Sequence, residues 1–237
     1  MKFLKLTAAI CLVVCGMGAA FAQEALIRKN LAERLPNLPK IDEVSKTPMN
    51  GLYELRVNDS DIFYTDSEGN FLIQGALIDS KSKRNLTEER TEKLNAVEFS
   101  ALPLKDAFTI VRGNGKRKMA VFEDPNCGYC KRFERDLQNV NDVTVYMFLY
   151  PVLGADSVEK SKSIWCAKDR GKAWVDVMVR DMPVVKATCD TAAIDRNKAF
   201  GAKHKITGTP TLFFADGGRV PGAISAAQVE KFLAEAK

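Results

Sequence analysis

The chain has 237 residues, 46% of them hydrophobic, and a formal net charge of +5. A chain of this length can bury a hydrophobic core unaided, so its six cysteines are not needed merely to hold it together. The positive charge is diffuse, and Lys and Arg form no stripe interleaved with aromatic residues. We therefore expect no nucleic-acid partner.

The first 22 residues have the pattern of a cleavable signal peptide. Lys2 and Lys5 precede an apolar run at residues 6–14, and residues 20–22 read A-F-A, an A-x-A cleavage signal. The run is too short to span a bilayer comfortably, which takes about 20 apolar residues. A lipoprotein signal ending at Cys15 is the alternative, but the Val before it is a poor fit. We expect a soluble, exported protein that starts at residue 23.

A small antiparallel sheet is predicted next. Three short runs rich in aliphatic and aromatic residues, at 52–57, 62–65 and 70–78, are separated by the turn clusters N-D-S and D-S-E-G. A segment of about 60 residues with so few strands buries little apolar surface. It therefore needs a partner, and a second copy of the chain is the economical candidate. We assign residues 23–83 to an N-terminal dimerisation domain.

Residues 85–99 predict a polar helix. Thr87 is a candidate N-cap, acidic residues follow in the first turn, and no Gly or Pro interrupts the stretch. Its apolar residues are sparse, which is typical of a solvated connector rather than of a packed core. We interpret residues 84–101 as a linker helix.

From residue 102 onwards strand and helix patterns alternate. Ser225 and Gln228 have the spacing of a capping box at the start of the last helix. The predicted strands are 118–122, 143–150 and 211–214, and the predicted helices are 127–137, 157–179 and 191–203. This order indicates a layered α/β domain at residues 102–237.

A C-x-x-C pair lies where the first of these strands turns into a helix. Asn126 is a candidate cap, which would place Cys127 in the first turn, where the positive end of the helix dipole lowers a thiol pKa. Cys130 lies one turn further on the same face. The pattern predicts thiol-disulfide exchange in which Cys127 attacks and Cys130 resolves.

The alternatives for the C-x-x-C cysteines are a zinc site and a purely structural bridge. A zinc site would need a second C-x-x-C or a pair of histidines, and the chain has one histidine. A purely structural bridge between Cys127 and Cys130 would close too short a loop. Cys166 and Cys189 enclose residues 167–188, and a bridge there would stabilise the fold by roughly 3 kcal/mol. Two buried free thiols remain the alternative for that second pair.

These motifs together resemble the DsbC family of periplasmic thiol:disulfide interchange proteins. The resemblance rests on the strand before C-G-Y-C, on I-W-C-A-K-D-R-G-K-A-W at 164–174 followed by Cys189, and on T-G-T-P-T-L-F-F at 207–214. It implies a thioredoxin-like catalytic domain with a helical insertion, after a cystatin-like dimerisation domain. It also implies a V-shaped periplasmic homodimer whose cleft holds misfolded disulfide-containing secreted proteins, and a transmembrane thiol reductant of the DsbD type. We expect no cofactor and no metal.

The resemblance also assigns roles to residues. It makes Cys127 the nucleophile and Cys130 the resolving thiol, and it implies a structural disulfide between Cys166 and Cys189. The dipeptide between the active-site cysteines, Gly128-Tyr129, differs from those of thioredoxin and of the DsbA oxidants and favours an isomerase.

The resemblance further implies a substrate-binding loop at Thr209-Pro210, with its proline in the cis form and facing the active-site cysteines. Thioredoxins carry a buried acid six residues before the first cysteine, and here that position is Val121. Glu123 and Asp124 are nearer, but sequence does not fix their burial. The proton acceptor for Cys130 therefore stays unassigned.

The leading hypothesis is a dimeric disulfide isomerase and reductase with chaperone-like substrate binding. A monomeric thiol oxidant, a non-enzymatic holdase with incidental cysteines, and a reductase of cysteine sulfenic acids are the alternatives.

Overall fold

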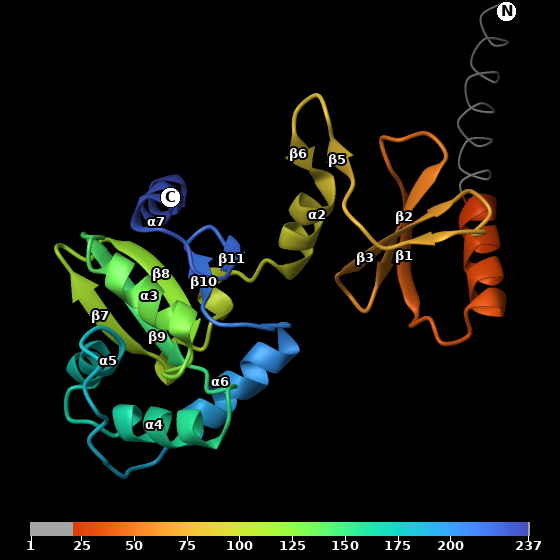
Figure 1. Ribbon diagram of the computed structural model, residues 1–237. Helices are drawn as coiled ribbons and strands as arrows, with labels where there is room; N and C mark the ends of the chain where they lie inside the picture. The colour runs from red at the N-terminus through yellow and green to blue at the C-terminus, as the bar shows by residue number, and fades with distance from the viewer. Residues whose placement is uncertain (1–20, 237) are drawn as a thin grey trace, which may run out of the picture. The chain divides into compact units, whose positions relative to one another are not determined.

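The computed structural model describes residues 21–236, which form two compact units that divide between Leu94 and Asn95 (Figure 1). The predicted signal peptide, residues 1–22, lies almost wholly outside the described residues. None of the described helices is long and apolar enough to cross a membrane. The domain limits placed at residues 22, 83 and 101 remain predictions.

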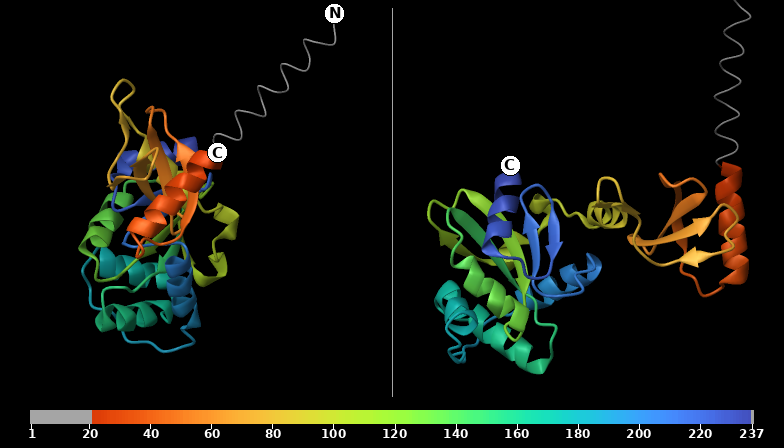
Figure 2. Two further views of the ribbon diagram at one scale, coloured as in Figure 1. Left: turned by 90° about the vertical axis from the view of Figure 1, so that its right-hand side faces the viewer. Right: turned by 45° about the horizontal axis from the view of Figure 1, so that its top comes forward.

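The N-terminal unit is a helix packed on a four-stranded antiparallel sheet (Figure 2). The described part of the helix covers residues 21–34, and its Ile27 and Leu31 pack with Leu55 and Val57 of the sheet. In sheet order the strands are β1 (Ile41–Lys46), β2 (Leu52–Val57), β3 (Asp61–Asp66) and β4 (Leu72–Ile73). The antiparallel sheet is confirmed, whereas β1 and the helix were not predicted.

A short hairpin, β5 (Ile78–Asp79) with β6 (Arg84–Asn85), leads into α2 (Leu86–Asn95). The predicted cap at Thr87 is wrong. Asn85 caps the helix instead, because its side-chain oxygen accepts the Glu88 backbone N–H at 3.2 Å. The Thr87 hydroxyl accepts the Leu77 N–H at 2.7 Å. Helix α2 also ends four residues before the predicted end, at Asn95.

No residue of α2 is buried, so the helix does not contribute to a hydrophobic core. Polar contacts attach it to the N-terminal sheet: the Arg90 guanidinium binds Glu54 at 3.0 Å and Glu43 at 2.9 Å, and the Thr87 hydroxyl hydrogen-bonds the Tyr64 hydroxyl. The polar surface expected from the sequence is therefore present, and ion pairs hold it.

The second unit is built on a five-stranded sheet in the order β11-β10-β8-β9-β7. Strands β8 and β9 are parallel, and every other neighbouring pair is antiparallel. The strands are β7 (Phe108–Arg112), β8 (Arg117–Glu123), β9 (Val143–Leu149), β10 (Thr211–Phe214) and β11 (Arg219–Pro221). The predicted thioredoxin-like fold is present, with β7 and β11 as unpredicted edge strands.

Helices cover both faces of this sheet, and side chains of β8 alternate between them. Met119 and Val121 pack in the core under α3 (Gly128–Leu137) and α7 (Ala226–Glu235), and α3 crosses the sheet in Figure 1. Ala120 and Phe122 pack in the opposite core, which Phe200 of α6 (Ala192–Lys203) closes. The same alternation turns Glu123 toward α3.

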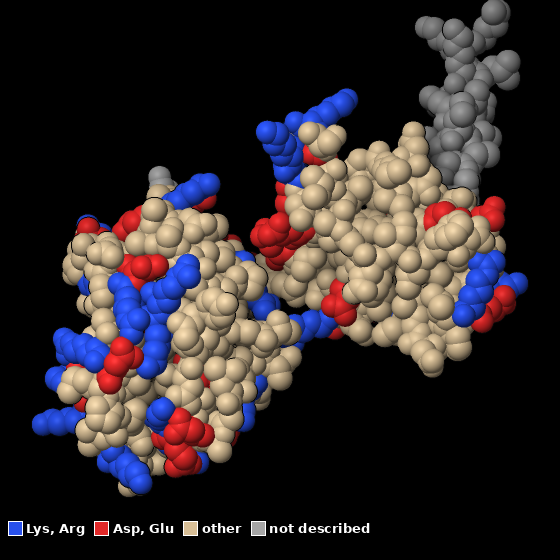
Figure 3. All heavy atoms as spheres, viewed as in Figure 1, with Lys and Arg blue, Asp and Glu red and all other residues tan. Residues whose placement is uncertain are grey.

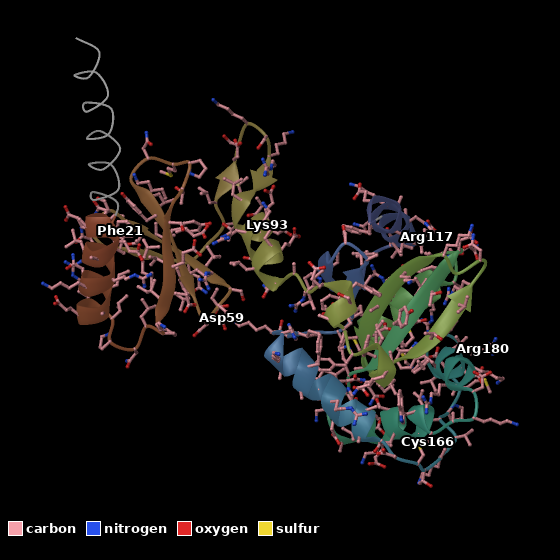
Figure 4. The ribbon with its side chains drawn as sticks, turned by 180° about the vertical axis from the view of Figure 1, so that it is seen from behind. Phe21, Asp59, Lys93, Arg117, Cys166 and Arg180 are labelled. Atoms are coloured by element: carbon pink, nitrogen blue, oxygen red, sulfur yellow. A yellow bond between two sulfur atoms is a disulfide. The ribbon has the colours of Figure 1, made fainter. Side chains whose placement is uncertain are left out.

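The helical insertion differs from the prediction at one point. The single helix expected at 157–179 is two helices, α4 (Ala155–Trp165) and α5 (Arg170–Met178). Asp169 starts α5 by accepting the Lys172 N–H at 2.9 Å, so the chain turns between the two helices. Cys166, labelled in Figure 4, ends α4. The predicted capping box of Ser225 and Gln228 is confirmed.

Candidate active site

The two cysteines lie at the start of α3, directly after the carboxyl end of β8. Cys127 is itself the N-cap: its backbone is extended, and its sulfur accepts the Cys130 backbone N–H at 3.4 Å. The predicted cap, Asn126, is wrong. Its side chain instead donates to Asp156 at 2.7 Å and to Ser157 at 3.0 Å.

The N-cap position makes Cys127 a good thiolate. Its pKa is lowered to about 5, first by a hydrogen bond from the Cys130 thiol, then by Thr209 and by the backbone N–H groups of Cys130 and Tyr129, against the opposing effect of burial. A thiol with this pKa is ionised at neutral pH and is therefore a ready nucleophile.

Cys130 has the opposite environment. Its side chain is fully buried, whereas Cys127 is 6% exposed. Burial raises the pKa of the Cys130 thiol, and the hydrogen bond to Cys127 raises it further. Both cysteines are free thiols in this structure. The Cys127 sulfur is thus reactive and keeps a small exposed area, whereas the Cys130 thiol is protonated and fully buried.

The other predicted site residues surround Cys127. The Thr209–Pro210 peptide bond is cis, and the Cys127 sulfur lies 3.3 Å from the Thr209 carbonyl oxygen, to which its protonated form can donate. Tyr129 is 69% exposed, and Gly128 has open space where a side chain would be. The structure therefore brings the C-G-Y-C segment and the Thr209-Pro210 loop together.

A buried aspartate fixes the loop before Cys127. The Asp124 carboxylate accepts the backbone N–H of Asn126 at 2.8 Å, those of Val152 and Leu153 at 2.8 and 2.9 Å, and the Ser157 hydroxyl at 2.7 Å. One carboxylate therefore joins the active-site loop to the segment after β9 and to α4.

Two further carboxyl groups lie beneath Cys130. Glu123, at the end of β8, and Glu134, on the buried face of α3, are both fully buried. Burial raises the pKa of each carboxyl group. The sequence left the role of Glu123 open and did not single out Glu134. The spacing between Cys130 and Glu134 could have indicated that they are neighbours, because a residue four positions after Cys130 lies on the same helix face.

Cys166 and Cys189 are joined by a disulfide with a Cα separation of 5.4 Å, as predicted. In residues 21–236, no group of three or more His, Cys, Asp or Glu side chains is placed to hold a metal ion. Basic and acidic side chains lie interspersed on the face of the second unit that Figure 3 shows. The described chemistry is therefore concentrated in the cysteine pair at α3.

Comparisons with known proteins identify the family. A thioredoxin-like domain matches residues 104–237, and the disulfide bond isomerase N-terminal domain matches residues 18–88. The chain is 43% identical to the probable thiol:disulfide interchange protein DsbC of Bordetella pertussis, over 89% of this chain and 74% of that one. It belongs to the DsbC family.

Other members are more distant. DsbC of Escherichia coli K12 is 32% identical over 92% of this chain and 90% of its own. The crystal structure of a disulfide interchange protein from Neisseria gonorrhoeae superposes with a TM-score of 0.54 and 38% identity, over 57% of this chain and 98% of that one. This DsbC-family protein is thus a thiol:disulfide interchange enzyme, an oxidoreductase with a thioredoxin-like fold.

Proposed function

We propose that this protein is a disulfide isomerase and reductase of the periplasm, with Cys127 as nucleophile and Cys130 as resolving thiol. The observation that carries the proposal is the contrast between the two sulfurs, because a thiolate with a pKa of about 5 sits beside a buried, protonated thiol. A protein that rearranges disulfides needs one sulfur that attacks readily and a second that can end the reaction.

The proposed reaction begins when the Cys127 thiolate attacks one sulfur of a wrong substrate disulfide. A bond forms between Cys127 and the substrate, and the other substrate sulfur leaves as a thiolate. If a substrate thiolate then attacks another bond, the substrate is rearranged and Cys127 is released. If Cys130 attacks first, the substrate leaves reduced and Cys127 and Cys130 form a disulfide.

Substrate chains would bind along the rim of the site. In the proposal, Thr209 and Pro210 present backbone to an extended substrate segment, as sheet-edge pairing requires. Tyr129, Val152 and Leu153 are 69%, 45% and 57% exposed. The Asp124 hydrogen bonds hold the last two next to the active-site loop. These apolar side chains suit an unfolded substrate better than a polar folded surface.

The N-terminal unit supports a homodimer in this proposal. Strand β4 is at the edge of its sheet, and Phe71 and Ile73 there are 68% and 47% exposed. An apolar sheet edge is a natural place for two copies to pair. The dimer would hold misfolded secreted proteins in a cleft, giving chaperone-like binding, and a transmembrane reductant of the DsbD type would keep Cys127 and Cys130 reduced.

The test is repair of a protein with scrambled disulfides. We expect the wild type to restore the native form, the Cys127→Ala variant to be inactive, and the Cys130→Ala variant to accumulate mixed disulfides with the substrate. Activity of Cys127→Ala equal to wild type would favour a holdase. In cells, thiol trapping should find Cys127 and Cys130 reduced while Cys166 and Cys189 are bridged. A resting disulfide between Cys127 and Cys130 would instead favour an oxidant.

The proposed dimer has its own test. Ile73→Glu should shift the full-length protein toward the monomer in sedimentation velocity experiments, because a charge on the edge strand opposes pairing. The matched control is Ile78→Glu, because Ile78 is 58% exposed but belongs to the separate β5–β6 hairpin. This variant should leave the dimer intact. A wild type that sediments as a monomer would refute the dimer.

A further inference from the structure

The carboxyl groups of Glu123 and Glu134 are buried without the partners that buried charges need. Within the described residues, none of their oxygen atoms has a hydrogen-bond donor at normal geometry. Buried ionised carboxylates are costly unless they are paired and hydrogen-bonded. In the part of the chain that the structure describes, the Arg112 guanidinium is the one cation paired with them, 4.0 Å from Glu134. This arrangement therefore favours a pair that keeps one proton over a pair in which both carboxyl groups are ionised.

The pair therefore has one charge at neutral pH, and its position can be assigned. Arg112 and the buried Trp174 indole N–H both favour the ionised form of Glu134. Among residues 21–236 no cation lowers the pKa of Glu123, and the negative charges of Glu134 and of the Cys127 thiolate raise it further. Two close carboxyl groups in such surroundings share one proton and titrate as a unit. These surroundings favour a protonated Glu123 next to an ionised Glu134 in the resting state.

Cys130 needs a base during the resolving step. Its thiol lowers the pKa of both the Cys127 thiol and the Glu123 carboxyl group. In the mixed disulfide Cys127 carries no negative charge, so it no longer competes for the Cys130 proton. The Cys130 side chain is fully buried, so bulk water does not reach it. Glu123 is the group left to receive this proton.

We propose that Glu123 and Glu134 form a proton relay that ionises Cys130 when it resolves the mixed disulfide, a role that rests on the proposed functions of Cys127 and Cys130. Cys130 gives its proton to one oxygen of Glu123, and Glu123 passes the proton on its other oxygen to Glu134. The pair then holds two protons instead of one. The Cys130 thiolate attacks the Cys127 sulfur, a bond forms between them, and the substrate sulfur leaves with the electron pair as a thiolate.

The relay fills the gap that Val121 leaves at the position of the usual buried acid. Glu123 is two residues further along β8, so it faces the same side of the sheet as Val121. It differs from a single acid because its partner Glu134 comes from α3 itself, four residues after Cys130. In this relay Glu134 acts only through Glu123, whereas Glu123 takes the proton of the reacting thiol.

The experiment separates the two chemical steps in the full-length protein with its Cys166–Cys189 disulfide intact. Reduced protein is mixed rapidly with glutathione disulfide and quenched with acid, and mass spectrometry counts the mixed disulfide and the Cys127–Cys130 disulfide. Attack by Cys127 is measured alone in the Cys130→Ala background. The variants are Glu123→Gln and Glu134→Gln. Asp106→Asn, which alters another buried carboxyl group that pairs with Arg196, is the matched control.

We expect both Glu→Gln variants to slow resolution about 100-fold at pH 7, the usual contribution of a general base. Attack by Cys127 should be unchanged, and Asp106→Asn should resolve at the wild-type rate. In Glu123→Gln the resolution rate should rise about tenfold per pH unit, because without the internal base the rate follows the ionised fraction of the Cys130 thiol. Resolution at the wild-type rate in both Gln variants, or an equal slowing of both steps, would overturn the relay.

A second measurement does not depend on kinetics. Infrared spectra of the reduced wild type at pH 7 should contain the carbonyl band of a protonated carboxylic acid, and Glu123→Gln should lack it. Absence of the band from the wild type would refute the shared proton. Failure of Cys127 to form the mixed disulfide in the Cys130→Ala background would instead refute the proposed cysteine roles, whatever the glutamate variants do.

Discussion

The Asp124 carboxylate accepts the backbone N–H of Leu153 at 2.9 Å and so joins two loops that are 29 residues apart in the sequence. The same carboxylate holds the residue before Cys127 and the first turn of α4. The position of the nucleophile therefore depends on a fully buried side chain that carries no part of the exchange chemistry.

Asp124→Asn should lower the free energy of unfolding by about 2 kcal/mol, because an amide group turns one acceptor into a donor that faces other donors. Urea unfolding monitored by circular dichroism measures this. Asp156→Asn is the matched control, since that side chain is 70% exposed and should change little. Equal stability of the two variants would contradict the structural role of Asp124.

The pKa of Cys127 should depend on Cys130 more than on any other single side chain, because the Cys130 thiol provides the largest lowering effect. Ultraviolet absorbance of the thiolate should titrate near pH 5 in the reduced wild type. The midpoint should rise in Cys130→Ala, and it should rise less in Thr209→Val. An unchanged midpoint in Cys130→Ala would show that the helix terminus alone sets the pKa.

The same pKa predicts how stability depends on pH. The folded-state pKa of about 5 is below the unfolded value near 8.5, so the unfolded chain binds more protons between these limits and the Cys127 contribution to stability grows as pH rises. It is complete above pH 8.5 and is lost as pH falls to 5. The upper limit of the slope is about 1.4 kcal/mol per pH unit.

Cys130→Ser and the double variant Cys127→Ser/Cys130→Ser isolate this effect, since neither forms the active-site disulfide and both keep Cys166 bridged to Cys189. The difference between their urea unfolding free energies should increase from pH 5 to pH 8. A difference that is constant or that decreases would contradict the lowered thiol pKa.

The Cys166–Cys189 disulfide should contribute stability rather than chemistry. It closes a loop with a sequence separation of 23 and joins the end of α4 to the segment before α6. The variant Cys166→Ala/Cys189→Ala should lose roughly 3 kcal/mol in urea unfolding. Its Cys127 titration should match the wild type, and a shifted titration would place the disulfide in the active site.

The sequence predicted features that depend on local patterns. Strand β10 has the predicted bounds, and the capping box of Ser225 and Gln228 is present, because short spacings determine both. The positions of Cys127 and Cys130 at a strand-to-helix turn were also predictable. These features need no knowledge of which distant segments pack together.

Other features depend on tertiary packing and could not be predicted in the same way. Whether Cys127 or Asn126 caps α3 depends on contacts from α4, which draw the Asn126 side chain away. Glu123 and Glu134 become a pair only when α3 packs on β8. Acidic residues are ordinarily solvated, so the sequence did not predict the burial of Glu123 in its strand or of Glu134 in its helix.

The attachment of α2 makes one part of this protein responsive to ionic strength. Apolar contacts of Ile27 and Leu31 fix the helix at residues 21–34, whereas Arg90 fixes α2 through partly exposed ion pairs. Dissolved salt screens such pairs, since the Debye length falls from about 10 Å at 0.1 M to about 3 Å at 1 M. Concentrated electrolyte would therefore weaken the ion pairs of α2 while the apolar contacts of the helix at residues 21–34 and of the two hydrophobic cores of the second unit persist.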